Sequence, residues 1–500
     1  MDMLLSALSY INSMTIIVVI VGCLFGLFVG AIPGLTATMA IALMVPFTFF
    51  LDPVPALSLM IAVGASSIYA GDIPGALLNI PGTPASAAYV EDSHTLVLEG
   101  KANRVLGLGL TSSVIGGLIG TIILAFTAPY LAKFALKFST FEYTWLSLIG
   151  LSCATIVAGS KTSRSLLTLV LGIALSTIGF DEFTGHERFT FGMESLLQGV
   201  SFIPAMIGLF AISGAIDFYV KTYKKENVFS TVPPIEKGMN IFKGLGSRLS
   251  HKSVGILRSG VLGTLIGALP GAGSDIAAWI SYALSKKLSK HPEKYGSGSE
   301  EAIIDASSSN NASLAGSWIP SLVFGIPGDS ASAIIIGVLF MKDMKPGPTL
   351  FLFNPEKLYA VFIIFAIANI ILLPLAFLAV NVLKKIIKID NGIIYPVVIL
   401  CSIVGAFAIN NDISSVVVML IMGVLGYFLQ RFDYPISPII LGMILGPMLE
   451  KNLISSLLKA NGDYGAFFER PVSGVLSVIF ILIVLVQIMS NIRRMMKKSK

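Results

Sequence analysis

The chain has 500 residues and a formal net charge of +6, yet only 12% of its residues are charged and 55% are hydrophobic. Its mean hydropathy is +0.85. Because soluble domains carry about 25% charged residues, this composition argues against a secreted enzyme, a nucleic-acid binder or a disordered scaffold, and it predicts an integral membrane protein.

Long apolar runs predict an all-α polytopic membrane protein with about 10–14 spans plus re-entrant segments. In chain order, the predicted spans are 15–32, 37–51, 105–126, 143–158, 166–178, 203–220, 256–269, 276–284, 361–382, 393–409, 416–428, 436–449 and 472–489. Two further stretches, 56–88 and 302–340, are apolar but interrupted by Gly and Pro. We expect these two stretches to contain the broken helices.

Charge divides the chain into four parts. The polar connection 221–252 and the tail 491–500 are rich in Lys and Arg, so the positive-inside rule places both in the cytoplasm. The segment before Met14 has no Lys or Arg and is predicted to lie outside. We therefore expect a first membrane repeat at 1–220, a cytoplasmic linker at 221–252, a second membrane repeat at 253–490 and a cytoplasmic tail at 491–500.

An internal repeat connects the two membrane parts. GLFVGAIPG at 26–34 matches GTLIGALPG at 263–271, and IPGALLNIPGTPASA at 73–87 matches IPSLVFGIPGDSASA at 319–333. The charge pattern gives the first half an odd number of crossings, so the second half starts from the opposite side. Together these features predict inverted-topology repeats, an architecture of many secondary transporters.

Four Pro-Gly pairs mark predicted helix breaks: Pro33-Gly34, Pro81-Gly82, Pro270-Gly271 and Pro327-Gly328. Pro removes a backbone donor and Gly tolerates unusual dihedrals, so helices break there. Irregular backbone at membrane depth is tolerated inside protein or beside a water-filled cavity. Half-helix N-termini favour anions, and exposed carbonyl groups favour Na⁺. We expect the breaks to converge on one site.

Small polar residues beside the breaks supply the candidate ligands. The predicted substrate-binding residues are Asn79, Gly82, Thr83, Ser86, Asn310, Asn311, Gly328, Asp329, Ser330 and Ser332. The predicted cation-binding residues are Gly34, Thr36, Ser274 and Asp275. The adjacent Asn310 and Asn311 stand out because buried amides are costly unless they are satisfied.

Other interpretations stay open at this point. Gly, Ser and Thr also pack transmembrane helices closely without any ligand. Asp72 and Asp329 are also compatible with a boundary near water, and Asp305 with a polar loop. No P-loop, HExxH motif or nucleophile elbow is present, so no enzyme, cofactor or metal beyond Na⁺ is predicted. A channel or exchanger without partners, or a membrane enzyme acting on lipid, are the alternatives.

The motifs resemble the large membrane subunit of the tripartite tricarboxylate transporter family, the TctA type. The matching stretches include GAIPGLTATMAIALMVPFTF at 30–49, LLNIPGTPASAA at 77–88, IGALPGAGSDIAAWISYALSKKLSKHPEKYGSGSEE at 266–301 and MKPGPTLF at 344–351. SNNASLAG and IPSLVFGIPGDSASAIIIGVLF within 309–340 match too. The resemblance implies a symporter that imports a tri- or dicarboxylate in the cell inner membrane, driven by Na⁺ or H⁺. It implies a small four-helix membrane subunit and an extracytoplasmic solute-binding protein as partners.

The sequence departs from the family pattern at two places. Ala306 and Ser307 stand where family members usually carry a Pro-Glu pair, and Asp329 replaces an uncharged residue. An elevator movement and a homo-oligomer are both compatible with the resemblance. Nucleic acid is not an expected partner, whereas membrane lipid is.

Overall fold

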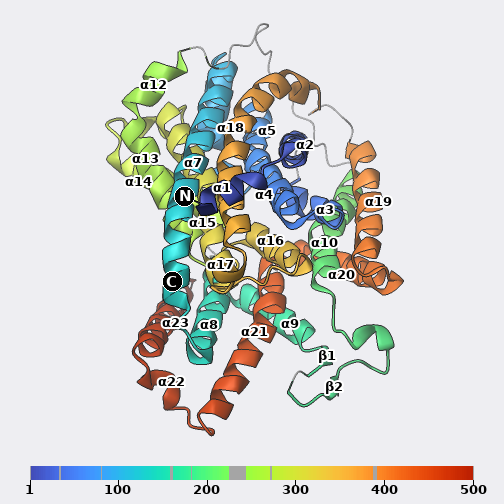
Figure 1. The fold of residues 1–500 in the computed structure, drawn as a ribbon. Coiled ribbons are helices and arrows are strands. Elements are labelled where there is room, and N and C mark those ends of the chain that lie inside the picture. The colour runs from blue at the N-terminus through green and yellow to red at the C-terminus, as the bar shows by residue number, and fades with distance from the viewer. Residues whose placement is uncertain are drawn as a thin grey trace.

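The protein is described by a computed structural model over residues 2–498, apart from 33–34, 80, 158–161, 182, 224–241, 243, 271–272 and 387–390. Helices make up nearly all of its regular structure (Figure 1). The break at Pro33-Gly34, residue Gly271 of the third break, and most of the predicted linker 221–252 lie outside the described residues.

The first half ends with the helical segment that precedes the predicted linker. Its elements are α1 (Asp2–Ser9), α2 (Ser13–Gly30), α3 (Ala37–Thr48), α4 (Pro53–Ala70), α5 (Asp72–Leu78), η1 (Ser86–Ala88), α6 (Val90–Leu98), α7 (Ala102–Ala135), α8 (Thr140–Val157), α9 (Thr162–Ser176), β1 (Gly179–Phe180), β2 (Glu187–Arg188), η3 (Glu194–Leu196), α10 (Phe202–Ile207), η4 (Gly208–Ile212) and α11 (Ser213–Tyr223). The two short strands pair antiparallel, with Gly179 opposite Arg188.

The second half repeats the order of a helix, a break and a long buried helix. Its elements are α12 (Leu245–His251), α13 (Ser253–Gly267), α14 (Gly273–Leu288), η5 (Pro292–Lys294), α15 (Glu300–Phe324), α16 (Ser330–Met341), α17 (Leu350–Phe353), α18 (Pro355–Ile386), α19 (Asn391–Asn410), α20 (Ile413–Arg431), α21 (Ser437–Lys459), α22 (Ala466–Glu469) and α23 (Pro471–Lys498).

Within the described residues, eight helical segments are long and apolar enough to cross a membrane, and four shorter helices are also apolar. The eight are Ser13–Gly30, Pro53–Leu78, Ala102–Ala135, Phe202–Val220, Pro355–Ala379, Ile413–Arg431, Ser437–Lys459 and Pro471–Met489. On α23, large apolar side chains such as Val475, Leu482 and Val486 are exposed. A helix of this kind is stable when lipid covers it. The prediction of an all-α polytopic membrane protein is confirmed.

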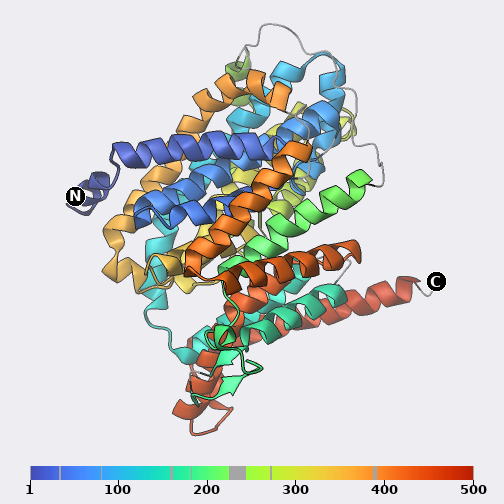
Figure 2. The same cartoon turned by 90° about the vertical axis from the view of Figure 1, so that its right-hand side faces the viewer.

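The two chain ends lie at opposite sides of the molecule in Figure 2, and the end of α11, drawn in green, lies on the side of the C-terminus. The described ends of α11 and α23, which adjoin the two basic segments of the sequence, therefore lie toward one side. The charge pattern predicts this arrangement, and the assignment of that side to the cytoplasm stays a prediction.

Two helices form the buried centre. Every residue of α4 from Val54 to Ala70 is buried, and so is every residue of α15 from Ala302 to Val323. The stretches expected to be broken at 56–88 and 302–340 therefore each begin with an uninterrupted helix. Their breaks lie after these helices, around residues 79–85 and 325–329. Polar residues are tolerated along α15 because other helices, rather than lipid, surround it.

Glycines allow each buried helix to approach a neighbour closely. A Cβ atom at Gly26 of α2 would lie 2.6 Å from the Val63 carbonyl oxygen of α4, and one at Gly263 of α13 would lie 2.3 Å from the Ser309 carbonyl oxygen of α15. Both distances are too short for any side chain, so these contacts require glycine. Gly26 and Gly263 occupy matching positions in the sequence repeat, so the two halves build the same helix pair.

Candidate functional site

The second break follows α5 and contains several predicted substrate residues. Asn79 ends α5 in the left-handed conformation, with φ 58°, and its side chain is exposed. The N–H of Gly82 donates to the Gly71 carbonyl at 3.1 Å. A Cβ atom on Gly82 would lie 2.5 Å from that same oxygen, so the returning chain fits against α5 because residue 82 is glycine.

The fourth break repeats this arrangement after α15. That helix ends at Gly325, which has φ 71°. Gly328 then lies against the centre of the protein, where a Cβ atom would be 2.7 Å from both the Gly267 carbonyl oxygen and Ser317 Cα. Because Ser317 and Gly71 occupy matching repeat positions, both breaks return against the same part of their preceding helix.

The polar residues after both breaks form the same reciprocal pair of hydrogen bonds. The Ser86 N–H donates to Thr83 Oγ1 at 3.1 Å, while the Thr83 N–H donates to Ser86 Oγ at 3.1 Å. Likewise the Ser332 N–H donates to Asp329 Oδ1 at 2.7 Å, and the Asp329 N–H donates to Ser332 Oγ at 2.9 Å. Asp329 and Ser332 form a capping box at α16, which Ser330 begins, whereas η1 begins at Ser86 without a side-chain cap.

Contacts between α14 and its surroundings bring three breaks together. A Cβ atom at Gly273, which starts α14, would lie 2.8 Å from the Asp329 Cβ atom of the fourth break. The Trp279 indole N–H donates to the Pro84 carbonyl of the second break at 3.2 Å. The second, third and fourth breaks therefore surround α14 and α15.

Three of the four predicted cation residues lie at the starts of two helices. Thr36 caps α3, because its hydroxyl oxygen accepts the Met39 N–H at 3.2 Å. Ser274 and Asp275 lie in the first turn of α14. Gly34 and the side chain of Asp275 lie outside the described part of the chain, so the cation site expected at these four residues stays a prediction.

The Asn pair lies in the buried middle of α15. Asn311 Nδ2 donates to the Ser113 carbonyl of α7 at 2.9 Å and to Asn369 Oδ1 of α18 at 2.8 Å. Asn369 Nδ2 donates to the Phe365 carbonyl at 2.9 Å. Asn311 thus joins three helices through its amide nitrogen, while its Oδ1 has no hydrogen-bond partner.

Asn310 is more unusual, since it is 1% exposed and neither amide atom has a hydrogen-bond partner. The Ser307 hydroxyl one turn earlier is also buried and unpartnered. Ser307 lies beside the carboxylate of Asp72, which accepts the Tyr89 hydroxyl at 2.6 Å. We call Asp72, Tyr89, Ser307, Asn310 and Asn311 the polar cluster. Asp72 is half-buried and contacts the buried Tyr89, so the predicted boundary near water at this residue stays a prediction.

Ion pairs fix the start of α15. Glu300 accepts from Arg104 of α7 at 3.2 Å and from Arg248 of α12 at 2.6 Å. Asp305, which the sequence alone could not place, is buried in α15 and pairs with Arg258 of α13 at 2.5 Å. The basic side chains around α15 therefore pair with carboxylates near the start of this helix and not with the polar cluster.

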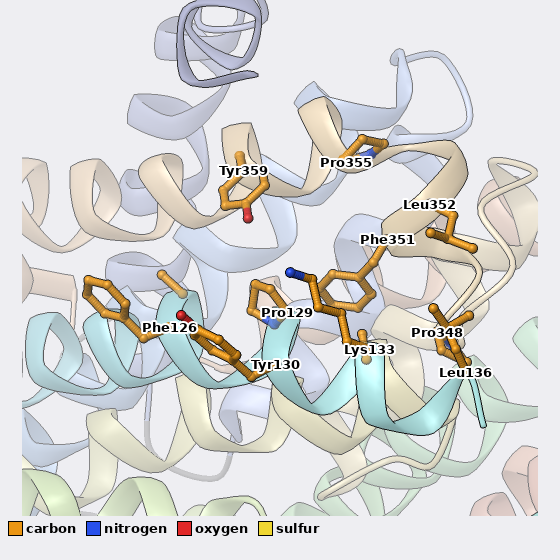
Figure 3. A pocket seen from close by; sticks show the side chains of 12 residues that line it. Phe126, Pro129, Tyr130, Lys133, Leu136, Pro348, Phe351, Leu352, Pro355 and Tyr359 are labelled. Carbon is orange, nitrogen blue, oxygen red and sulfur yellow. The ribbon is translucent and has the colours of Figure 1, made fainter. Parts of the chain in front are cut away.

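A groove of about 400 Å³ lies elsewhere, between α7 and the α17–α18 region (Figure 3). Aromatic and apolar side chains such as Phe126, Phe351 and Leu352 line it, and Lys133 is the one charged residue among the described residues that line it. This chemistry differs from the amide, hydroxyl and carboxylate groups of the polar cluster. The polar cluster is the stronger candidate for a small polar ligand.

Comparisons with known proteins agree with this fold. The model of the family described as "Tripartite tricarboxylate transporter TctA family" matches residues 16–441. An "Uncharacterized 52.8 kDa protein in TAR-I ttuC' 3'region" of Agrobacterium vitis is 31% identical over 474 residues, covering 95% of this chain and 93% of that protein. An "Uncharacterized protein in TAR-II ttuC' 3'region" of the same organism is 31% identical over 231 residues, covering 46% of this chain and 96% of that protein. No solved structure gives a significant match. Since the family model spans most of the sequence, the chain belongs to the tripartite tricarboxylate transporter TctA family.

Proposed function

We propose that this chain is the large membrane subunit of a secondary transporter that imports a small organic anion, a tri- or dicarboxylate. A gradient of Na⁺ or H⁺ drives it. It works with a small four-helix membrane subunit and an extracytoplasmic solute-binding protein, and lies in the cell inner membrane with its C-terminus in the cytoplasm. The two halves act as inverted repeats around the site, and the movement is of the elevator type.

The observation that carries this proposal is Asn310, an unsatisfied amide in the middle of a buried helix of a TctA family protein. A buried polar group without a partner is unfavourable unless a ligand completes it. The reciprocal hydrogen bonds after the second and fourth breaks hold the backbone of these breaks in place, so the ligand would meet a preformed surface.

Asn310 and Asn311 have different roles in this proposal. Asn310 Nδ2 makes no well-formed hydrogen bond and lies near the Tyr89 hydroxyl, so it can donate to a substrate carboxylate. Asn311 Nδ2 already donates to the Ser113 carbonyl and to Asn369 Oδ1, so Asn311 positions α15. Only its side-chain oxygen is left to contact a ligand. A hydrogen bond from Asn310 to a carboxylate contributes about 1.5–3 kcal/mol, because one partner is charged.

The test is uptake of radiolabelled citrate, succinate and tartrate into proteoliposomes, with and without the two partner proteins and an inward Na⁺ or H⁺ gradient. Asn310→Ala should reduce uptake of the transported anion at least about tenfold, since 1.4 kcal/mol corresponds to a factor of ten. The matched control is Asn452→Ala on α21, whose Nδ2 donates to the Met448 carbonyl of its own helix; its uptake should match the unmodified protein.

Three outcomes would count against parts of this proposal. Unchanged uptake in Asn310→Ala would contradict the site. Full uptake without the solute-binding protein and small subunit would favour the stand-alone channel or exchanger. Failure to transport any of the acids with partners and gradients present would contradict the substrate class.

A further inference from the structure

The polar cluster presents a set of oxygen atoms that come from distant parts of the chain. Ser307, Asn310 and Asn311 share one face of α15, because residues three and four apart are neighbours on a helix. Asp72 at the start of α5 and Tyr89 before α6 lie opposite this face, with Ser307 beside Asp72 and Asn310 near the Tyr89 hydroxyl.

Four polar atoms of the cluster lack hydrogen-bond partners: Ser307 Oγ, Asn310 Oδ1, Asn310 Nδ2 and Asn311 Oδ1. Three of the four are oxygens. The amide nitrogen of Asn311 is committed to α7 and α18, so its oxygen is fixed in direction. The Tyr89 hydroxyl occupies Asp72 Oδ1, which leaves Oδ2 beside Ser307.

The negative charge of the polar cluster decides whether these oxygens would bind an anion, a proton or a metal cation. Asp72 supplies one carboxylate, and among the ion pairs of the described residues none includes Asp72. An anion at the oxygens would be repelled by that carboxylate. A proton on Asp72 Oδ2 would neutralise the carboxylate and donate to Ser307, but it would leave Asn311 Oδ1 without a partner. Divalent cations usually bind several carboxylates, whereas this cluster has one.

We propose that a monovalent cation of the size of Na⁺ binds among Asp72 Oδ2, Ser307 Oγ, Asn310 Oδ1 and Asn311 Oδ1. This inference rests on the proposed transport function and names a coupling ion and a site for it, apart from the site predicted at Gly34, Thr36, Ser274 and Asp275. The amide of Asn310 then links the two ligands, because its oxygen faces the cation while its nitrogen donates to the substrate carboxylate. The cation also offsets the Asp72 charge, so the anion binds better once the cation is present.

The other half of the chain lacks an equivalent cluster. Pro81 and Pro327 are separated by 246 residues, and at this spacing Asp72 corresponds to Trp318, Ser307 to Ile61, Asn310 to Gly64 and Asn311 to Ala65. The reciprocal hydrogen bonds of Thr83 with Ser86 and of Asp329 with Ser332, by contrast, occur in both halves. The sequence repeat therefore accounts for the helix breaks in both halves. The proposed cation ligands have no counterparts at the matching repeat positions. One such cation binds per chain.

The experiment measures binding of radioactive sodium to the purified full-length chain with its partner subunits, in the absence of substrate. The variants are Asp72→Asn and Ser307→Ala, with Asp463→Asn in an exposed loop as the matched control. Ser307→Ala removes a hydroxyl that lies beside Asp72 and makes no well-formed hydrogen bond, so little internal bonding is lost. It should keep the fold and weaken sodium binding about tenfold, and Asp72→Asn should abolish binding.

A second readout is the melting temperature, since a ligand that binds the folded state raises it. Sodium, but not potassium, should raise the melting temperature of the unmodified protein and of Asp463→Asn, and leave that of Asp72→Asn unchanged.

No sodium binding, or equal binding in every variant, would overturn the cation site. Anion uptake that needs no sodium would overturn it too but leave transport standing. Sodium binding without uptake of any acid would overturn the substrate class alone.

Discussion

At the residue scale, the carboxylate of Asp92 joins α6 of the first half to the loop that precedes α15. Its Oδ1 accepts the N–H groups of Gly296 at 2.9 Å, Gly298 at 3.0 Å and Ser299 at 2.8 Å. Its Oδ2 accepts the Tyr282 hydroxyl at 3.0 Å. Because Asp92 and Ser299 are both buried, the Ser299 N–H would be left without an acceptor in the absence of the carboxylate, while the other donors would lose a charged partner.

Replacing Asp92 by Ala should therefore lower stability more than replacing an exposed aspartate. We expect Asp92→Ala to reduce the free energy of unfolding by about 3 kcal/mol, because charge-assisted hydrogen bonds are lost and the buried Ser299 N–H is left without an acceptor. Thermal unfolding of the purified protein checks this value, with Asp463→Ala as control. Equal melting temperatures for the two variants would contradict it.

The members of the polar cluster differ in how far the sequence could predict them. Adjacent amides in an apolar region are a local signal, so Asn310 and Asn311 could be predicted. Asp72, Tyr89 and Ser307 are individually ordinary and far apart in the chain. Their proximity results from the packing of α5 against α6 and of α15 beside them, which no spacing rule conveys.

At the scale of elements, the contact between α13 and α15 depends on Gly263. A methyl group there would lie 2.3 Å from the Ser309 carbonyl oxygen, so the two backbones would have to separate. We expect Gly263→Ala to reduce the yield of monodisperse protein severalfold, measured by size-exclusion chromatography. The control is Gly246→Ala in α12, where an added Cβ meets nothing within 4 Å. Similar profiles for the two variants would contradict the requirement for glycine.

Hydropathy predicted the lipid-facing helices but not the continuity of the central ones. The predicted spans 15–32, 105–126 and 472–489 correspond to α2, α7 and α23. By contrast, α4 and α15 contain Pro, Gly and many Ser residues, which led to the prediction of broken stretches. Pro53 and Pro55 lie in the first turn of α4, where proline is compatible with a helix, whereas Pro320 lies inside α15. Neighbouring helices, rather than lipid, surround the polar side chains of α4 and α15.

At the scale of the whole molecule, the positions of the two ends lead to a prediction about orientation. We expect Ser9→Cys to react with a membrane-impermeant maleimide in intact cells, because α1 lies on the side predicted to be outside. A fluorescent protein fused to the C-terminus should remain in the cytoplasm and fluoresce. Protection of residue 9 together with an external C-terminal fusion would show the opposite orientation.

The glycine contacts have a mechanical consequence. The backbones of α13 and α15 touch at Gly263, and those of α7 and α15 touch at Gly116, where a Cβ atom would lie 2.0 Å from the Ser308 carbonyl oxygen. Neighbouring turns have little room to slide past each other, because at Gly263 a shift by one residue would bring Leu262 or Thr264 into the gap. These three helices must therefore travel together, and any displacement during a transport cycle has to occur at looser boundaries elsewhere. The close packing of α7, α13 and α15 thus restricts relative movement to the other helix boundaries of the protein.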